Sequence, residues 1–263
     1  MEATVNGVRI GYTDEGKGLP LLFVHGFPLS REAWRRQAAA LRASWRVLAP
    51  DLPGFGESEA RTGPATMDAF AADLEGLLRH LAAGAVVLVG HSMGGYVALA
   101  FARLYPEMLR GLVLVGTRAG PDTPEAAAAR RATAAKVEAG GAGVVIDAMA
   151  PKMLSPANRD PGMARAVREF MAGASREGVI GALLGMAARP DATPGLAGIH
   201  VPVLVVTGQD DVLIPPAESE ALAKAIPGAR LGIIPGAGHL VAFERPEAFN
   251  GILEAWLPKG GFP

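Results

Sequence analysis

The sequence contains no cysteine among its 263 residues. Without cysteine there is no disulfide framework, no thiolate metal site and no cysteine nucleophile. The chain also lacks a charge imbalance, because 25 basic residues face 26 acidic ones, so it has no electrostatic footprint for nucleic acid or an anionic membrane. No apolar run has membrane-spanning length, and the first residues lack the features of a signal peptide. We therefore expect a soluble, cytoplasmic protein.

Half of the residues are hydrophobic, which allows a large core and excludes wholesale disorder. Short apolar runs, typical of strands buried on both faces, alternate with stretches of helical spacing. These runs lie at residues 21–24, 46–49, 86–89, 112–115, 201–206 and 230–234. The alternation predicts an α/β fold, a mostly parallel sheet with helices on both faces. Asn6-Gly7 predicts an antiparallel hairpin at its N-terminal edge. A helix capped by Ser30 is expected over residues 30–43.

The stretch from 118 to 196 breaks the alternation, because it contains helical patterns but no strand-like run. It is too long for a connection and too short for an ordinary second domain. We therefore expect a core domain made of residues 1–117 and 197–263, with 118–196 inserted over the sheet as a helical cap. Its large apolar side chains could line a pocket, but for most of them packing on the core is the simpler interpretation. They are Met149, Met153, Leu154, Phe170, Met171, Leu183, Leu184 and Met186.

The apolar run at 86–89 leads directly into a Gly-x-Ser-x-Gly motif, and a helical pattern follows. This motif places a serine on a sharp, strained turn between a strand and a helix. The residues two before and two after the serine must be nearly free of side chain, and Gly90 and Gly94 meet that demand. The pattern predicts Ser92 as a nucleophile.

A serine nucleophile needs a base within hydrogen-bond reach and a carboxylate that orients the base. Among the five histidines only His239 lies on a Gly-rich loop directly after a predicted strand, so it is the expected base. The loop after the strand at 201–206 offers two adjacent carboxylates, Asp210 and Asp211. Either one gives the chain order Ser, Asp, His that accompanies this elbow. The residues alone do not choose between them.

The oxyanion formed by attack of a serine on a carbonyl needs two preorganised backbone N–H donors. Met93, directly after the nucleophile at a helix start, is expected to supply one of them. The other should come from the loop after the strand at 21–24. Because Pro28 has no N–H and favours an extended residue before it, the Phe27 amide is the expected second donor.

Taken together, these motifs resemble those of the α/β-hydrolase fold superfamily, essentially end to end. The resemblance covers residues 25–28 (His-Gly-Phe-Pro), 50–58, 90–95, 208–215 and 238–239. It implies Asp211 as the acid, because the family pattern places the acid three residues after the glycine of its loop. Asp51 occupies a second signature loop of the family, and we favour bracing of its own turn as its role.

Residues 116–125 and 185–191 look like those of small serine carboxylesterases and 3-oxoadipate enol-lactonases. That likeness implies a cofactor-free hydrolase that cleaves esters of small to medium acyl chains through an acyl-enzyme, with the triad Ser92, His239 and Asp211. Relatives that open epoxides or displace halide carry Asp at the position of Ser92, so we do not expect those activities. The scattered histidines offer no paired metal-ligand spacing, so no metal is expected.

Three alternatives share the same triad. An enol-lactone hydrolase would need a basic group facing its anionic substrate, and Arg118, Arg130, Arg131, Lys152 and Arg189 are available. A perhydrolase is suggested by the Phe27-Pro28 loop, which is similar to that of cofactor-free haloperoxidases. A ligand sensor of this fold would keep all three residues but turn its ligand over far more slowly than an ordinary enzyme.

Overall fold

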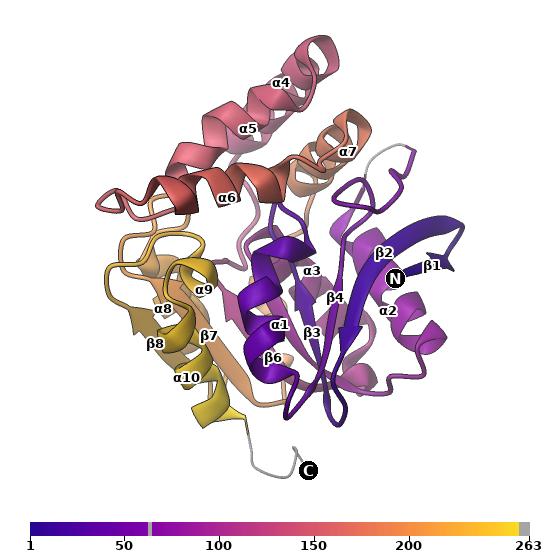
Figure 1. The fold of residues 1–263 in the computed structure, drawn as a ribbon, viewed down its shortest axis with the longest axis vertical. Coiled ribbons are helices and arrows are strands. Elements are labelled where there is room, and N and C mark those ends of the chain that lie inside the picture. Colours follow the sequence, from indigo (N-terminus) through magenta and orange to yellow (C-terminus); the bar gives the residue numbers. More distant parts are fainter. Residues whose placement is uncertain (63–64, 258–263) are drawn as a thin grey trace.

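The computed structural model describes residues 1–62 and 65–257, and they form one eight-stranded sheet enclosed by helices (Figure 1). The strand order is β1-β2-β4-β3-β5-β6-β7-β8. The strands are β1 (Glu2–Val5), β2 (Val8–Glu15), β3 (Pro20–Val24), β4 (Arg46–Pro50), β5 (Val86–His91), β6 (Leu109–Val115), β7 (Val203–Gly208) and β8 (Arg230–Ile234). All neighbours from β4 to β8 are parallel, and β1 and β2 pair antiparallel at one edge. The predicted fold class is confirmed.

The N-terminal hairpin forms at the predicted dipeptide. Asn6 has a φ of 50° and Gly7 a φ of 77°, as a two-residue turn that matches the twist of its strands requires. The Asn6 side chain also donates to the Ala72 carbonyl at 3.1 Å and to Asp73 at 3.2 Å. These bonds tie the turn to helix α2 (Met67–His80).

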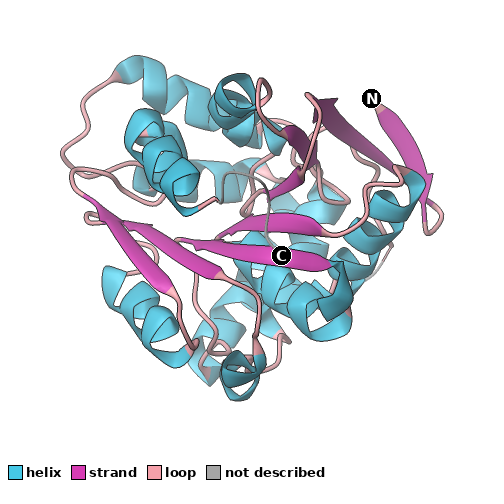
Figure 2. Cartoon of the chain, turned by 90° about the horizontal axis from the view of Figure 1, so that it is seen from below, coloured by secondary structure: helices cyan, strands magenta, loops and turns pink. Residues whose placement is uncertain are grey.

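Helices cover both faces of the sheet, as Figure 2 shows. One face packs on α1 (Arg35–Leu41) and α10 (Pro246–Trp256), and the other on α2, α3 (Met93–Leu104) and α8 (Pro216–Ala225). Successive strand residues divide between the faces: Phe23 joins the first cluster, and Leu22 and Val24 join the second. Burial on both faces explains why these strands are continuous apolar runs.

The expected helix over residues 30–43 is wrong in its first part. The chain forms a 3-10 helix at Arg31–Trp34 and only then α1, and the Ser30 side chain makes no capping hydrogen bond. The backbone N–H of Arg31 donates instead to a carboxylate oxygen of Asp51, at 2.7 Å. The first N–H of this helix, which has no partner within the helix, is thus satisfied by a loop distant in sequence.

Residues 118–196 contain no strand. Their helices are α4 (Pro124–Gly140), α5 (Gly143–Met149), α6 (Pro161–Met171) and α7 (Arg176–Ala187). The four helices lie together at one end of the sheet, at the top of Figure 1. We refer to residues 118–196 as the inserted helical segment.

The inserted helical segment is attached closely to the loop after β4. Gly54 and Gly178 touch through their backbones, because a Cβ added at Gly54 would lie 2.3 Å from the Gly178 Cα. The Ser175 N–H and hydroxyl both donate to the Gly54 carbonyl, at 2.9 and 3.0 Å. Further along α7, the Gly181 carbonyl accepts from the Ala65 N–H at 3.1 Å.

A second attachment joins the segment to the chain after β8. The Leu240 N–H donates to the Met153 carbonyl at 2.8 Å, and the Phe170 and Phe243 rings meet edge to face at 4.9 Å. All eight large apolar side chains named above belong to, or pack partly buried against, the hydrophobic clusters of the molecule. Packing therefore accounts for them, as the simpler interpretation held.

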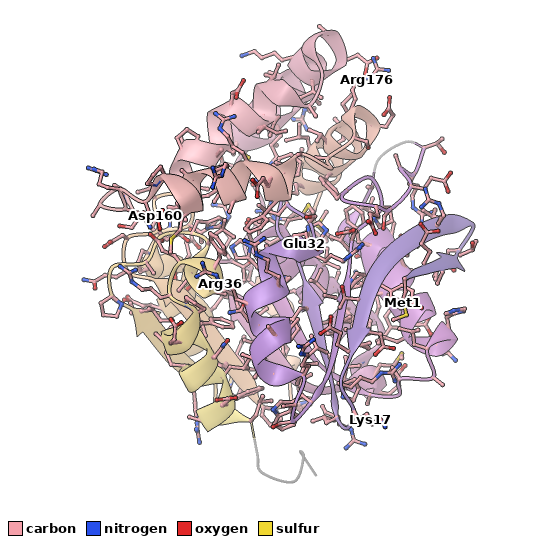
Figure 3. The ribbon with its side chains drawn as sticks, in the orientation of Figure 1. Met1, Lys17, Glu32, Arg36, Asp160 and Arg176 are labelled. Atoms are coloured by element: carbon pink, nitrogen blue, oxygen red, sulfur yellow. The ribbon has the colours of Figure 1, made fainter. Side chains whose placement is uncertain are left out.

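Most of the charged side chains in the described ranges are not buried. Lys17 and Arg176, for example, lie at the periphery of the molecule (Figure 3). Within the described ranges, no helix combines the length and apolar character needed to cross a membrane.

Candidate active site

Three side chains predicted to act together are carried by loops at one edge of the sheet. Ser92 follows β5, Asp211 follows β7 and His239 follows β8. These strands are parallel, so their carboxyl ends share that edge. The β6 strand between them is followed by Gly116, where an added Cβ would lie 3.4 Å from Asp211 Oδ2 and 3.5 Å from His239 Nδ1.

Ser92 occupies a strained turn. Its φ is +53° and its ψ −114°, a region that costs a non-glycine residue about 1–3 kcal/mol. The surrounding structure holds it there: its N–H donates to the Val115 carbonyl at 2.9 Å, and its carbonyl accepts from the Thr117 hydroxyl at 2.8 Å. The Ser92 hydroxyl itself makes no hydrogen bond with any described residue.

The two glycines of the motif leave room for this turn. A Cβ at Gly90 would lie 2.4 Å from the Gly94 carbonyl oxygen, and one at Gly94 would lie 2.4 Å from the carbonyl oxygen of Val24. Neither position can accept a side chain unless the backbone moves. The predicted demand for small residues around Ser92 is therefore met by direct backbone contact.

Asp211 and His239 form a buried pair. Asp211 Oδ2 lies 2.7 Å from His239 Nδ1, and Asp211 Oδ1 accepts from the N–H groups of Leu213 and Ile214 at 2.8 and 2.9 Å. Burial alone would raise the pKa of Asp211, but the hydrogen bond to His239 and the two amides outweigh it and hold that pKa below its usual range. The ionised carboxylate thus fixes the ring tautomer with the proton on Nδ1 and leaves Nε2 to accept a proton.

Asp210 takes a different partner from its neighbour. Its Oδ2 accepts from the Ser155 hydroxyl at 2.7 Å, and its N–H donates to the Ala237 carbonyl at 2.8 Å. Of the two adjacent carboxylates, only Asp211 is hydrogen-bonded to His239. The geometry agrees with the choice that the family resemblance made.

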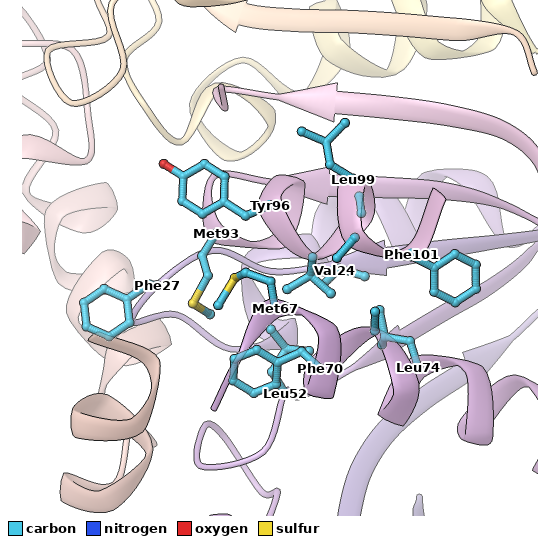
Figure 4. Packing of buried hydrophobic residues seen from close by; sticks show 14 of the residues in the cluster. Val24, Phe27, Leu52, Met67, Phe70, Leu74, Met93, Tyr96, Leu99 and Phe101 are labelled. Atoms are coloured by element: carbon cyan, nitrogen blue, oxygen red, sulfur yellow. The ribbon is translucent and has the colours of Figure 1, made fainter. Parts of the chain in front are cut away.

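The loop after β3 lies against the serine. A Cβ at Gly26 would be 3.0 Å from the Ser92 Cβ. Within the part of the chain that the structure describes, neither the Phe27 nor the Met93 backbone N–H has a hydrogen-bond partner, although both residues are buried. Figure 4 shows both side chains at one end of a hydrophobic cluster. Two buried, unbonded donors beside a serine are suited to bind an oxyanion.

Sequence reasoning gave no role to His25, which joins the loops after β3 and β4. Its Nδ1–H donates to the Gly26 carbonyl at 2.8 Å, and its Nε2 accepts from the Leu52 N–H at 2.9 Å. Burial lowers the pKa of His25, so the ring stays neutral and can both donate and accept. Asp51 braces its own turn through the Glu57 N–H at 2.9 Å, as favoured above, and also bonds Arg31.

His91 was also missed, although it precedes the nucleophile. Its ring centroid lies 4.7 Å from that of His239, and its Nε2–H donates to the His239 carbonyl at 2.9 Å. Burial and the neighbouring His239 lower the pKa of His91 to about 3, so its ring is neutral at ordinary pH. It therefore holds the backbone of the expected base without adding charge.

Glu244 is the third residue that sequence reasoning missed. Its buried carboxylate accepts from the backbone N–H groups of Gly238 and Ser155, at 2.7 and 3.0 Å, and from the Asn158 amide at 2.6 Å. It thereby joins the inserted helical segment to the residue next to His239. Its one sequence signal is a charge at the end of the apolar stretch 240–243. Across residues 1–62 and 65–257, no three metal-ligating side chains of the His, Asp and Glu types converge.

The family model of the alpha/beta hydrolase fold matches residues 20–246. The chain therefore belongs to this family of hydrolases, as the motifs implied.

Proteins similar to this chain include two solved structures. One is a thermophilic esterase from Thermogutta terrifontis, described with malate bound, which is 44% identical with a TM-score of 0.94 over 97% of both chains. The other is the enol-lactonase from Burkholderia xenovorans LB400, which is 30% identical with a TM-score of 0.89 over 97% of this chain and 99% of that one. BpoC, a candidate non-heme bromoperoxidase of Mycobacterium tuberculosis, is 30% identical over 254 residues, 92% of this chain and 95% of that protein.

Proposed function

We propose that this hydrolase cleaves carboxylic esters of small to medium acyl chains through an acyl-enzyme on Ser92. The observation that carries the proposal is the buried Asp211–His239 pair at the sheet edge where the strained serine turn lies. A carboxylate that fixes an imidazole beside an elbow serine is the arrangement that activates a hydroxyl. The similar esterase from Thermogutta terrifontis supports an ester as the substrate class.

In the proposed mechanism His239 Nε2 takes the Ser92 proton as the hydroxyl attacks the ester carbonyl. The N–H groups of Phe27 and Met93 stabilise the oxyanion. Asp211 stabilises the imidazolium that forms, and His239 then protonates the leaving alcohol. His239 next activates a water that attacks the acyl-enzyme, which releases the carboxylic acid and restores Ser92. The hydrogen bond between serine and base is often long in an unliganded enzyme and tightens with substrate bound.

We propose further that residues 118–196 serve as the cap that limits which acyl groups reach Ser92, over a core domain of residues 1–117 and 197–263. The segment is attached to the loop after β4, which His25 joins to the loop of Phe27, and to the chain after β8, next to His239. The buried side chains of the segment are largely apolar, which favours uncharged acyl groups.

Enol-lactone hydrolysis is the second candidate, favoured by the similar enol-lactonase from Burkholderia xenovorans. The positive charge of several of the basic residues that could face its anionic substrate is already partly balanced. Three of the five available residues, Arg118, Arg130 and Arg189, already pair with Asp122.

The deciding experiment is hydrolysis of p-nitrophenyl esters from acetate to dodecanoate, with Ser92→Ala as the matched control. We expect turnover that peaks at short or medium chains and falls on the order of 10⁴-fold or more in the control. Activity that survives in Ser92→Ala would contradict the mechanism. Slow turnover of every ester, together with rapid opening of an enol-lactone, would favour the second candidate. Peracid formation from acetate and hydrogen peroxide tests a perhydrolase side activity, and turnover far below ordinary enzyme rates for all substrates would indicate a ligand sensor.

A further inference from the structure

A cavity of about 730 Å³ lies apart from the candidate active site. It is bounded by α3, the start of α2 and the connection from α7 to β7, and its apolar walls are formed chiefly by Met67, Tyr96, Leu99, Ala119, Leu196 and Ile199. Figure 4 shows Tyr96 and Leu99 on α3 with Met67 beside them. None of the five predicted site residues lines it. Its volume falls in the range of about 300–1,000 Å³ found for small-molecule sites.

Two arginines, Arg118 and Arg189, line one end of this cavity. Arg189 is only 7% exposed, its guanidinium lies 4.2 Å from the centre of the Tyr96 ring, and it donates to Asp122 at 2.8 Å and to the Gly120 carbonyl at 2.9 Å. Arg118 donates to the same carboxylate through Nη2, at 2.9 Å. Its Nη1 has no hydrogen-bond partner in the described ranges, and the carboxylate oxygen of Glu218 lies 3.9 Å away. Unlike the enclosed Nε atoms of both arginines, this Nη1 can donate to the carboxylate of a ligand.

The charge at that end is positive. Arg118, Arg130 and Arg189 share the single carboxylate of Asp122, and the next acidic group, Glu218, lies 3.9 Å from Arg118. Three guanidinium groups therefore face two carboxylates.

The other charges that line the cavity lie nearer to solvent. Arg103 is bonded to Asp68, and Asp191 is exposed. Water and salt screen these exposed charges more than they screen the partly buried arginines around Asp122. The cavity thus has a cationic end and an apolar body.

We propose that this cavity is a second ligand site, which binds a small amphipathic carboxylate such as a medium-chain fatty acid. The carboxylate lies at Arg118, whose Nη1 can donate to it, and Arg189 adds positive charge beside it. The acyl chain lies along Leu99, Leu196 and Ile199, where burial contributes about 0.8 kcal/mol per methylene. The site does not depend on the proposed esterase activity.

Calorimetric titration with decanoate, below its micelle concentration, tests the proposal. We expect one decanoate to bind per chain, and decanol to bind at least tenfold more weakly because it has no carboxylate. Arg118→Gln and the cavity-filling Ala100→Trp should each weaken decanoate binding at least tenfold. Arg131→Gln, an exposed arginine on the same segment outside the cavity, is the matched control and should bind like the unaltered protein.

Two results would overturn the proposal. One is no decanoate binding to the unaltered protein. The other is binding that persists in both cavity variants but disappears when Ser92 is blocked by an organophosphate, because it would place the ligand at the ester site. Circular dichroism melting of each variant shows whether it is folded, and a folded second variant suffices if one of the two fails to fold.

Discussion

The strand-end loops and the inserted helical segment are held together by different kinds of contact. In the loops and the short helix after His239, the polar side chains of Asp211, His239 and Glu244 are at most 5% exposed, and each has hydrogen bonds. In the inserted segment, ion pairs such as Arg168–Asp147 lie at the surface, where a pair contributes only about 0–1 kcal/mol. The pairs of Asp122 are a buried exception, and most of the remaining segment is held by apolar packing and backbone contacts. The comparison suggests that the loops define the chemistry, while the helices are free to define the substrate.

The sharpest test of this comparison is the pair of adjacent aspartates. Asp211→Asn should lower kcat by about 10⁴-fold, because the amide cannot hold His239 in the tautomer that accepts a proton. Asp210→Asn should lower it by less than about tenfold, since Asp210 bonds Ser155 and not His239. Steady-state ester hydrolysis measures both, and the reverse order of the two effects would exchange their roles.

On the side of the helices, the largest expected effect is on stability. Phe170→Ala removes a ring that is 1% exposed and packs on Phe243, so it should lower the free energy of unfolding by about 3–5 kcal/mol. The rate per folded molecule should change much less than in Asp211→Asn. Denaturant unfolding measures the free energy of unfolding, and active-site titration gives the number of folded molecules to which the rate is referred. A loss of rate as large as that of Asp211→Asn would remove the distinction between the regions.

Glu244 connects the two regions, and its removal should affect both quantities moderately. In Glu244→Gln an amide N–H₂ must face one of the N–H groups of Ser155 or Gly238, and an unsatisfied buried donor costs about 1–3 kcal/mol. We expect that loss in unfolding free energy, and a fall in kcat of about tenfold with little change in KM, because His239 is displaced. Glu247→Gln, an exposed residue nearby, is the matched control. If both variants behave alike, Glu244 has no positioning role.

The effect that is smallest at neutral pH is a pH dependence of stability, which grows as the pH falls. The pKa of His91 is lowered from 6.5 to about 3 in the folded chain, so below pH 6.5 the unfolded chain takes up a proton that the folded chain does not. The contribution of neutral His91 to the unfolding free energy is therefore complete above pH 6.5. Between pH 6.5 and 3 the unfolding free energy falls by about 1.4 kcal/mol per pH unit for one such group. His25, whose pKa is also lowered, acts in the same direction. The unfolding free energy should be measured from pH 7 to pH 4. Its slope against pH should be smaller in His91→Gln than in the unaltered protein, by the equivalent of about one proton. An unchanged slope would contradict the assignment.

Local pattern was enough to predict the strands, the hairpin at Asn6 and the helix after Ser92, because each depends on residues adjacent in sequence. It could not choose between Asp210 and Asp211, since only the fold brings one of them to His239. The partners of His91 and Glu244 are distant in sequence or depend on loop geometry, so no periodicity indicated them. The hydrogen bond that holds the start of the helix at Arg31 also comes from a distant residue, Asp51, while the Ser30 side chain makes no capping bond.

The backbone contact between Gly54 and Gly178 limits how the protein can be redesigned. A side chain at either glycine would have to occupy the backbone of the other, so no substitution at one can make space for a change at its partner. Gly185 also cannot take a side chain, because a Cβ there would clash with the Ala65 carbonyl oxygen. A library that randomises α7 to alter substrate range should therefore leave Gly178 and Gly185 unchanged and vary the positions between them.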